Sequence, residues 1–368
     1  MDNYPYELLS NIFEIVLTDV LDAAFQLSLV SRRFYSIAGP LRYRRLRISG
    51  LKRLEEALAL VEKALQHTGA RDIGIYHLFL CNYAKEHALM MDTRMSNATR
   101  EDKMELAIDY YSQHPAFWDK ASHLLRLGSL SLRTLYVLDY SEYPDPNLYY
   151  AKKLTPYEDS RLLFALSSCR TYPKLRSLVV KHDLRRGVEI FKENSSWVRP
   201  EMPALSYLQV KARCFVGRAG EVKTLYPLLD GIHTRLPNLT RLAFLVNNEH
   251  SFPELMCILC GVSCPLDAQK IMGLGGPSGE RVKECIRKRI LPGNLERVEA
   301  HLGRSPTFVG WSGFSVGFFH DAVLEFVRRI DMKQVAGLEM IPFSPAYPNV
   351  GEREYELLVK SFEDGIRM

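Results

Sequence analysis

The chain has 368 residues and a formal net charge of +5 at pH 7, with 47% hydrophobic and 25% charged residues. This mixture is typical of a folded globular protein and excludes a largely disordered chain. A charge of +5 over this length does not by itself indicate binding to nucleic acid or to an anionic membrane. Because one hydrophobic core rarely extends over so many residues, we expect two or three structural units.

The amino-terminal sequence and the cysteines indicate the cellular compartment. The first residues, MDNYPYELL, contain neither the basic segment nor the apolar segment of a secretory signal peptide. The longest uncharged apolar run, residues 255–266, is too short to span a bilayer. Seven cysteines at irregular spacing are typical of reduced thiols rather than of a disulfide framework. We therefore expect a cytoplasmic or nuclear protein that does not associate with a membrane.

The first forty residues predict three short helices with shared apolar faces. Pro5 suits the first turn of a helix, where its missing N–H is not needed. A helical stripe follows, formed by Leu8, Leu9, Ile12, Phe13 and Val16. A second stripe is formed by Ala23, Leu27, Val30, Phe34 and Ala38. So short a segment cannot bury this much apolar surface within itself, so we expect it to pack against something else.

The order of these residues resembles an F-box. Residues 5–13 and 27–34 are similar to the pattern L-P-x-E-L-L-x-x-I-F followed by L-x-x-V-[CS]-R-x-[WF], with Tyr4 and Phe34 in place of the usual Leu and Trp. Residues 40–46 are similar to the stretch that follows the F-box in fungal families. The resemblance implies that residues 1–48 bind a Skp-type adaptor and, through it, the cullin and RING subunits of an SCF-type ubiquitin ligase. Carried over by position, the adaptor-binding residues are Pro5, Leu8, Leu9, Ile12, Phe13, Leu27, Val30 and Phe34. The alternative is an ordinary helical hairpin that packs on the rest of the chain.

Residues 49–130 predict a helical linker region that leads into the first solenoid units. Residues 51–66 have the periodicity of an amphipathic helix, and residues 73–80 that of a strand. A capping-box-like start at Thr99 predicts a helix that reaches about Gln113.

A short pattern, L-x-x-L-x-L, recurs within residues 131–368. It begins at Leu132, Leu175, Leu205, Leu239 and Leu295. Regular leucine-rich repeats are ~20–29 residues long, and these units are longer, so they carry insertions. Helical segments are expected between the strands at residues 160–168, 220–236 and 279–289.

We therefore predict a protein of the α/β class, with a three-helix F-box followed by an irregular leucine-rich-repeat-like solenoid. The five strands are expected side by side in one parallel sheet. A C-terminal helix, residues 352–366, is expected to cap the open end of the solenoid. The alternative is a plain α/β domain with several buried strands.

The chain contains no sequence pattern of a catalytic site. Cys257, Cys260 and Cys264 resemble part of a zinc motif, but no fourth cysteine stands at matching spacing, so we interpret them as buried hydrophobic residues. The glycine-rich residues 273–279 lack the Lys-Ser/Thr pair of a phosphate-binding loop. We therefore predict a non-catalytic subunit with no metal and no cofactor.

The predicted strands leave their third, fifth and seventh residues on the concave face of the solenoid. Four of the five strands carry a basic residue at one of these positions. We predict that this face binds an acidic or phosphorylated segment of a target protein through Tyr136, Lys181, Tyr207, Lys211, Arg241 and Arg297. The alternative function is a leucine-rich-like binding module for polyanions or other proteins outside a ubiquitin ligase, which the basic runs at residues 42–47 and 281–289 favour. No nucleic-acid-binding motif accompanies these runs, so nucleic acid is not an expected partner.

Overall fold

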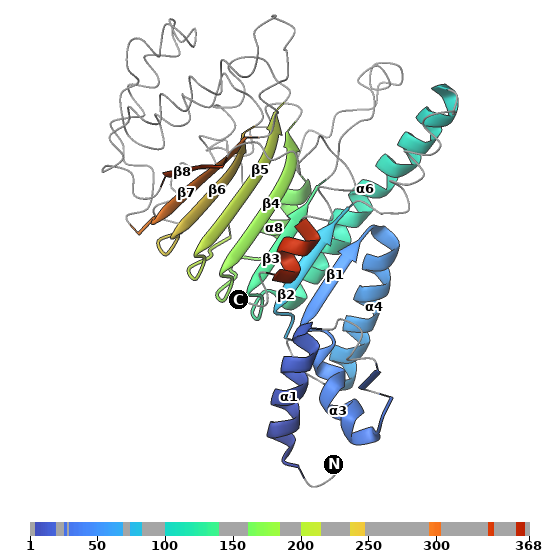
Figure 1. The fold of residues 1–368 in the computed structure, drawn as a ribbon. Helices are drawn as coiled ribbons and strands as arrows, with labels where there is room; N and C mark the ends of the chain where they lie inside the picture. Colours follow the sequence, from blue (N-terminus) through green and yellow to red (C-terminus); the bar gives the residue numbers. More distant parts are fainter. Residues whose placement is uncertain are drawn as a thin grey trace, which may run out of the picture.

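A computed structural model describes residues 4–19, 26–27, 29–68, 74–82, 100–139, 161–184, 200–214, 236–246, 294–302, 338–341 and 358–364. Its centre is an eight-stranded sheet in which every strand is parallel to its neighbours and the spatial order follows the chain (Figure 1). The strands are β1 (Arg45–Ser49), β2 (His77–Cys81), β3 (Thr134–Leu138), β4 (Ser177–Leu184), β5 (Tyr207–Cys214), β6 (Arg241–Val246), β7 (Arg297–Leu302) and β8 (Leu338–Ile341). The α/β class is therefore confirmed.

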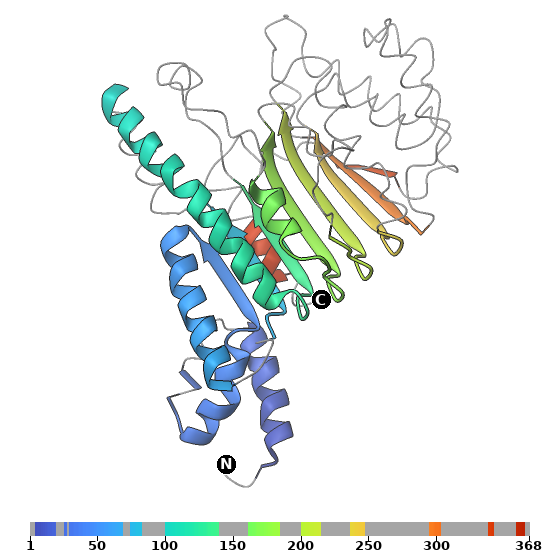
Figure 2. The same ribbon diagram turned by 180° about the vertical axis from the view of Figure 1, so that it is seen from behind.

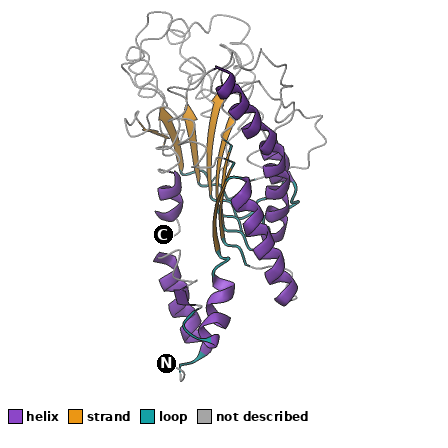
Figure 3. Ribbon diagram, turned by 90° about the vertical axis from the view of Figure 1, so that its right-hand side faces the viewer, coloured by secondary structure: helices purple, strands orange, loops and turns teal. Residues whose placement is uncertain are grey.

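Helices lie on both sides of this sheet. On one face α4 (Leu51–Thr68), α6 (Arg100–Gly128) and α8 (Arg161–Ser167) pack side by side (Figure 2). A helical segment at residues 358–364 lies on the opposite face, which we call the inner face (Figure 3). Helices α1 (Tyr6–Asp19) and α3 (Arg32–Leu41) lie beyond the edge at which the strands begin (Figure 1).

The recurring leucines explain why the middle strands align. The first leucine of each of four motifs is fully buried in the turn before its strand, at Leu132, Leu175, Leu205 and Leu239. The second leucines are cross-strand neighbours and are also buried, at Leu135, Leu178, Leu208 and Leu242. Each unit therefore buries its apolar side chains by stacking on the next. The prediction that the five strands form one parallel sheet is confirmed, and the strand expected at residues 73–80 joins the same sheet as β2.

Two helices differ from the prediction. Helix α6 continues past Gln113 and Pro115 to Gly128, although proline usually ends a helix. Its continuation is stabilised by the burial of Phe117 and Trp118, which outweighs the hydrogen bond that Pro115 removes. The expected position of the C-terminal helix is wrong, because residues 358–364 pack on strands β2 to β4 instead of capping the last strand.

Other predicted segments are only partly described. The helix expected at residues 160–168 is α8, whereas residues 220–236, 279–289 and the cysteines at 257–264 lie outside the described residues. Of the three helices expected at the amino terminus, the structure describes α1 and α3, with helical residues 26–27 between them. None of the described helices has the length and apolar character needed to cross a bilayer.

Candidate binding surfaces

The two N-terminal helices have a hydrophobic core of their own. Leu9 and Phe13 of α1 pack against Phe34, Ile37, Ala38 and Leu41 of α3. The rings of Phe13 and Phe34 meet edge to face, with 4.8 Å between their centroids. Three of the predicted adaptor-binding residues, Leu9, Phe13 and Phe34, are therefore buried inside the module and do not form its surface. In the folded chain these three side chains pack α1 against α3.

The other predicted adaptor-binding residues lie on or near the surface. Leu8 and Ile12, one helical turn apart on α1, are 44% and 43% exposed, and Val30 is 65% exposed. Pro5 is exposed and Leu27 is half-buried against the module core. A guanidinium N–H of Arg33 donates to the carbonyl oxygen of Tyr4, so the start of α1 lies beside the start of α3.

Exposed apolar side chains are concentrated in this module. Of ten large hydrophobic residues that are exposed in the described part of the chain, seven lie within residues 4–35. We call these seven the N-terminal apolar surface: Tyr4, Tyr6, Leu8, Ile12, Leu29, Val30 and Tyr35. Single exposed hydrophobic residues are common on any protein, whereas a group of this size in a short segment is typical of a docking surface.

On the inner face of the sheet the strands pair in the predicted register. One row across the strands consists of Thr134, Ser177, Tyr207, Arg241 and Arg297. The next row on the same face consists of Tyr136, Val179, Gln209, Ala243 and Glu299. The predicted target-binding side chains are therefore close to one another in space along β3 to β7.

The helix at residues 358–364 covers the first half of this face. Tyr136 is only 4% exposed, its hydroxyl lies 3.2 Å from the hydroxyl of Ser361, and its ring packs edge to face on Phe362. Burial raises the pKa of the Tyr136 hydroxyl above its ordinary value. Lys181 is also buried, at 5% exposed. Tyr136 and Lys181, two of the predicted target-binding residues, are therefore buried in the folded chain, and neither side chain is part of its surface.

The second half of the inner face carries a cluster of opposite charges. The guanidinium groups of Arg241 and Arg297 both contact one carboxylate oxygen of Glu299, at 2.9 and 3.1 Å. Arg241 also lies over the ring of Tyr207, 5.3 Å from its centroid. About half of the Arg241 side chain and two fifths of the Arg297 side chain are exposed. Lys211 lies further along β5, opposite Leu245 of β6, and its side chain is outside the described residues.

The side chains of Arg241, Arg297 and Glu299 together carry one net positive charge, and their mutual contacts limit the orientations of the two guanidinium groups. Such a cluster is suited to an acidic ligand that bridges the exposed N–H groups of both arginines. The role of Glu299 was not predicted. Its fifth position in the L-x-x-L-x-L motif, two residues after Arg297 in the sequence, is the only signal that could have indicated it.

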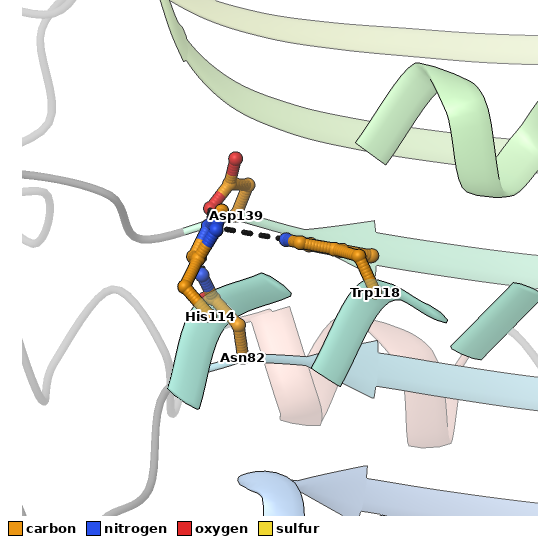
Figure 4. A network of polar contacts seen from close by, with 4 residues as sticks. All are labelled: Asn82, His114, Trp118 and Asp139. Carbon is orange, nitrogen blue, oxygen red and sulfur yellow. Dashed lines mark hydrogen bonds and ion pairs between the residues drawn. The ribbon is translucent and has the colours of Figure 1, made fainter. Parts of the chain in front are cut away.

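A buried polar network lies at the ends of β2 and β3 (Figure 4). The side-chain amide of Asn82 donates to Asp139 at 2.6 Å, and Nε2 of His114 lies 2.9 Å from the same carboxylate oxygen. The indole N–H of Trp118 donates to Nε2 of His114 at 3.1 Å. Because all of these side chains are buried, they fix α6 to the ends of two strands and are not placed to meet a substrate. Periodicity did not predict this network, although Asn82 and Asp139 each directly follow a strand.

Within the described part of the chain, no three His, Cys, Asp or Glu side chains are placed to hold a metal ion.

No family model, no curated protein and no solved structure matches the chain.

Proposed function

We propose that the chain is the substrate-recognition subunit of an SCF-type ubiquitin ligase, without a catalytic site of its own. The N-terminal helices bind a Skp-type adaptor, and the sheet binds a target protein. The observation that carries this proposal is the N-terminal apolar surface, which lies on a module whose interior is already filled by Leu9, Phe13 and Phe34. Burying each of its large side chains against a partner contributes roughly 1.5–3 kcal/mol.

The resemblance to an F-box supports the identity of that partner. Leu8, Ile12 and Val30 match F-box positions and are exposed, so they are available to an adaptor. The buried positions Leu9 and Phe13 keep the same pattern because they hold α1 against α3. The motif therefore contains two kinds of residue: exposed residues that are available to contact the adaptor, and buried residues that hold the two helices together.

Adaptor binding can be tested with changes that leave the module core intact. We expect Ile12→Asp, and separately Val30→Asp, to abolish capture of a purified Skp-type adaptor by the full-length chain, because each places an unpaired carboxylate in an apolar interface. Leu60→Asp is the matched control, since Leu60 is similarly exposed on α4, outside the module. Far-ultraviolet circular dichroism checks that all three variants are folded. Equal adaptor capture by the wild type and both test variants would contradict the proposal.

The target-binding part of the proposal is supported by the charge cluster on the second half of the inner face, where the side chains of Arg241 and Arg297 are partly exposed. Arg241 and Arg297 present guanidinium groups to solvent, and Tyr207 and Glu299 hold them in place. With Tyr136 and Lys181 buried, the target-binding surface is limited to strands β5 to β7. An acidic or phosphorylated target segment is the ligand that fits this charge.

A further inference from the structure

Three arginines and one tyrosine form a row across the sheet at the edge where its strands begin. Arg44, Tyr76, Arg133 and Arg176 each directly precede a strand, from β1 to β4. Backbone hydrogen bonds connect them: the N–H of Tyr76 donates to the carbonyl of Arg44 at 2.9 Å, that of Arg133 to Tyr76 at 2.8 Å, and that of Arg176 to Arg133 at 2.8 Å. We call these four residues the arginine row. The basic run at residues 42–47, which the proposed function does not use, includes one of its members.

Tyr76 holds two of the arginines in place. The guanidinium carbons of Arg44 and Arg133 lie 4.9 and 4.4 Å from the centroid of the Tyr76 ring. Because Tyr76 precedes the middle one of three neighbouring strands, the two arginines reach its ring from the two adjacent strands. Cation–π contacts of this kind limit the rotamers of the arginines, and this reduces the entropy that binding a ligand would remove.

Two of the arginines, Arg133 and Arg176, carry positive charge that no described side chain neutralises. Arg133 and Arg176 are exposed, and neither forms an ion pair within the described residues. The pKa of the nearby His77 is lowered to about 4, mainly by burial and secondarily by the charges of Arg45 and Arg133.

The dimensions of the row indicate the size of its ligand. Neighbouring strands are ~4.8 Å apart, so four of them place Arg44 and Arg176 about 14 Å apart, the length of roughly four residues of extended peptide. On the following strands the same position is occupied by Ser206, Thr240 and Glu296, so the basic surface ends after Arg176. A nucleic-acid duplex gains its affinity from many phosphate contacts along an extended basic stripe, which is absent from these described strands.

The chemistry of the row favours phosphate groups on a peptide over single-stranded nucleic acid. The guanidinium fork binds phosphate through two parallel hydrogen bonds. Single-stranded nucleic acid is bound by stacking its bases on aromatic rings, but Arg44 and Arg133 already lie over the ring of Tyr76. We propose that the arginine row binds a phosphorylated segment of a partner protein, at a site separate from the inner face. This site does not depend on the proposed function, because it uses neither the N-terminal apolar surface nor the cluster around Glu299.

The experiment measures fluorescence anisotropy of labelled peptides with the full-length chain. The probe is a Gly/Ser peptide with two phosphoserines four positions apart, which an extended chain places on one face and about 13 Å apart, close to the distance expected between Arg44 and Arg176. We expect the phosphorylated peptide to bind at least tenfold more tightly than its unphosphorylated counterpart. We expect Arg133→Glu with Arg176→Glu to remove that difference.

Two further comparisons distinguish the arginine row from a general effect of charge on the chain. Tyr76→Ala should weaken binding severalfold whereas Tyr76→Phe should not, because phenylalanine keeps the ring face that the arginines contact. Lys52→Glu with Arg53→Glu carries the same charge change on α4, away from the arginine row and the inner face, and should leave peptide binding unchanged. The proposal is overturned by equal affinity for the two peptides, by undiminished binding to Arg133→Glu with Arg176→Glu, or by tighter binding of a twenty-nucleotide single strand than of the phosphopeptide.

Discussion

The imidazole of His77 has a pKa that its surroundings lower strongly. Burial, followed by the charges of Arg45 and Arg133, lowers its pKa from the usual 6.5 to about 4. Its Nδ1 atom is buried and has no hydrogen-bond partner within the described residues. The folded chain therefore keeps this imidazole uncharged at pH values at which an exposed histidine takes up a proton.

We expect His77 to make the folded state less stable as the pH falls from 6.5 toward 4. In this range the unfolded chain binds a proton at His77 and the folded chain does not, so acid favours unfolding. The difference between the two pKa values corresponds to roughly 3 kcal/mol of unfolding free energy. Urea unfolding of the wild type and of His77→Gln, at pH 7 and pH 4.5, measures this contribution. A wild type that loses no more stability than His77→Gln over this interval would show that the site is not responsible.

Among the helices and strands, the periodicity of the sequence predicted most strands of the sheet. It did not predict strand β1 or which residues of the N-terminal helices are buried. Strands β3 to β6 were predictable because each buries the same motif positions against its neighbours, and β7 carries the same motif and pairs with β6. Strand β1 was missed because three of its five residues, in the sequence RLRIS, are not apolar. In the N-terminal module, adjacent residues such as Leu8 and Leu9 both fit one apolar stripe. Only the packing of α1 on α3 decides that Leu9 is buried and Leu8 is exposed.

The helix at residues 358–364 was predictable as a helix but not in its position. Its amphipathic pattern is local, whereas its partners Phe79 and Tyr136 lie more than 200 residues earlier in the chain. Phe362 packs edge to face on both rings, with centroid distances of 5.5 and 5.2 Å. Glu363 forms an ion pair with Arg47 of β1 at 2.8 Å. This short helix therefore joins the C-terminal residues to the first strands of the sheet.

We expect Phe362→Ala to destabilise the chain by about 3–5 kcal/mol, the usual cost of removing a buried aromatic ring. The exposed Lys360 on the same helix provides the control, and Lys360→Ala should change stability by less than about 0.5 kcal/mol. Cys81 provides a second measurement, because it is fully buried in the same cluster as Phe362. Its rate of modification by a thiol reagent, followed by peptide mass spectrometry, should rise in Phe362→Ala only. Unchanged protection of Cys81 would mean that the helix does not cover this part of the sheet in solution.

In the whole molecule, the two surfaces assigned to the proposed function belong to different structural units. The N-terminal apolar surface lies on α1 and near the start of α3, beyond the edge at which the strands begin (Figure 1). The cluster of Arg241, Arg297 and Glu299 lies on the second half of the sheet. The module has its own core, so a change on one surface is not expected to alter the other. A subunit that holds an adaptor at one end and a target at another requires this independence.

This independence predicts that the two binding activities can be removed separately. Arg241→Glu with Arg297→Glu would place two additional carboxylates beside Glu299, so it should repel an acidic target and abolish target capture while adaptor binding stays normal. Ile12→Asp should have the opposite effect. Lys52→Glu with Arg53→Glu on α4 has the same charge change away from the inner face and serves as the control.

The measurement is affinity capture of each variant from cells treated with a proteasome inhibitor, with adaptor and co-captured proteins quantified by mass spectrometry. Proteins that the wild type and the control retain, and that Arg241→Glu with Arg297→Glu loses, are targets of the inner face. Their capture should also weaken as salt rises, as expected for exposed charges. If the inner-face variant retained the same proteins as the wild type, recognition would lie elsewhere in the chain, and residues 141–156 would be the next segment to change.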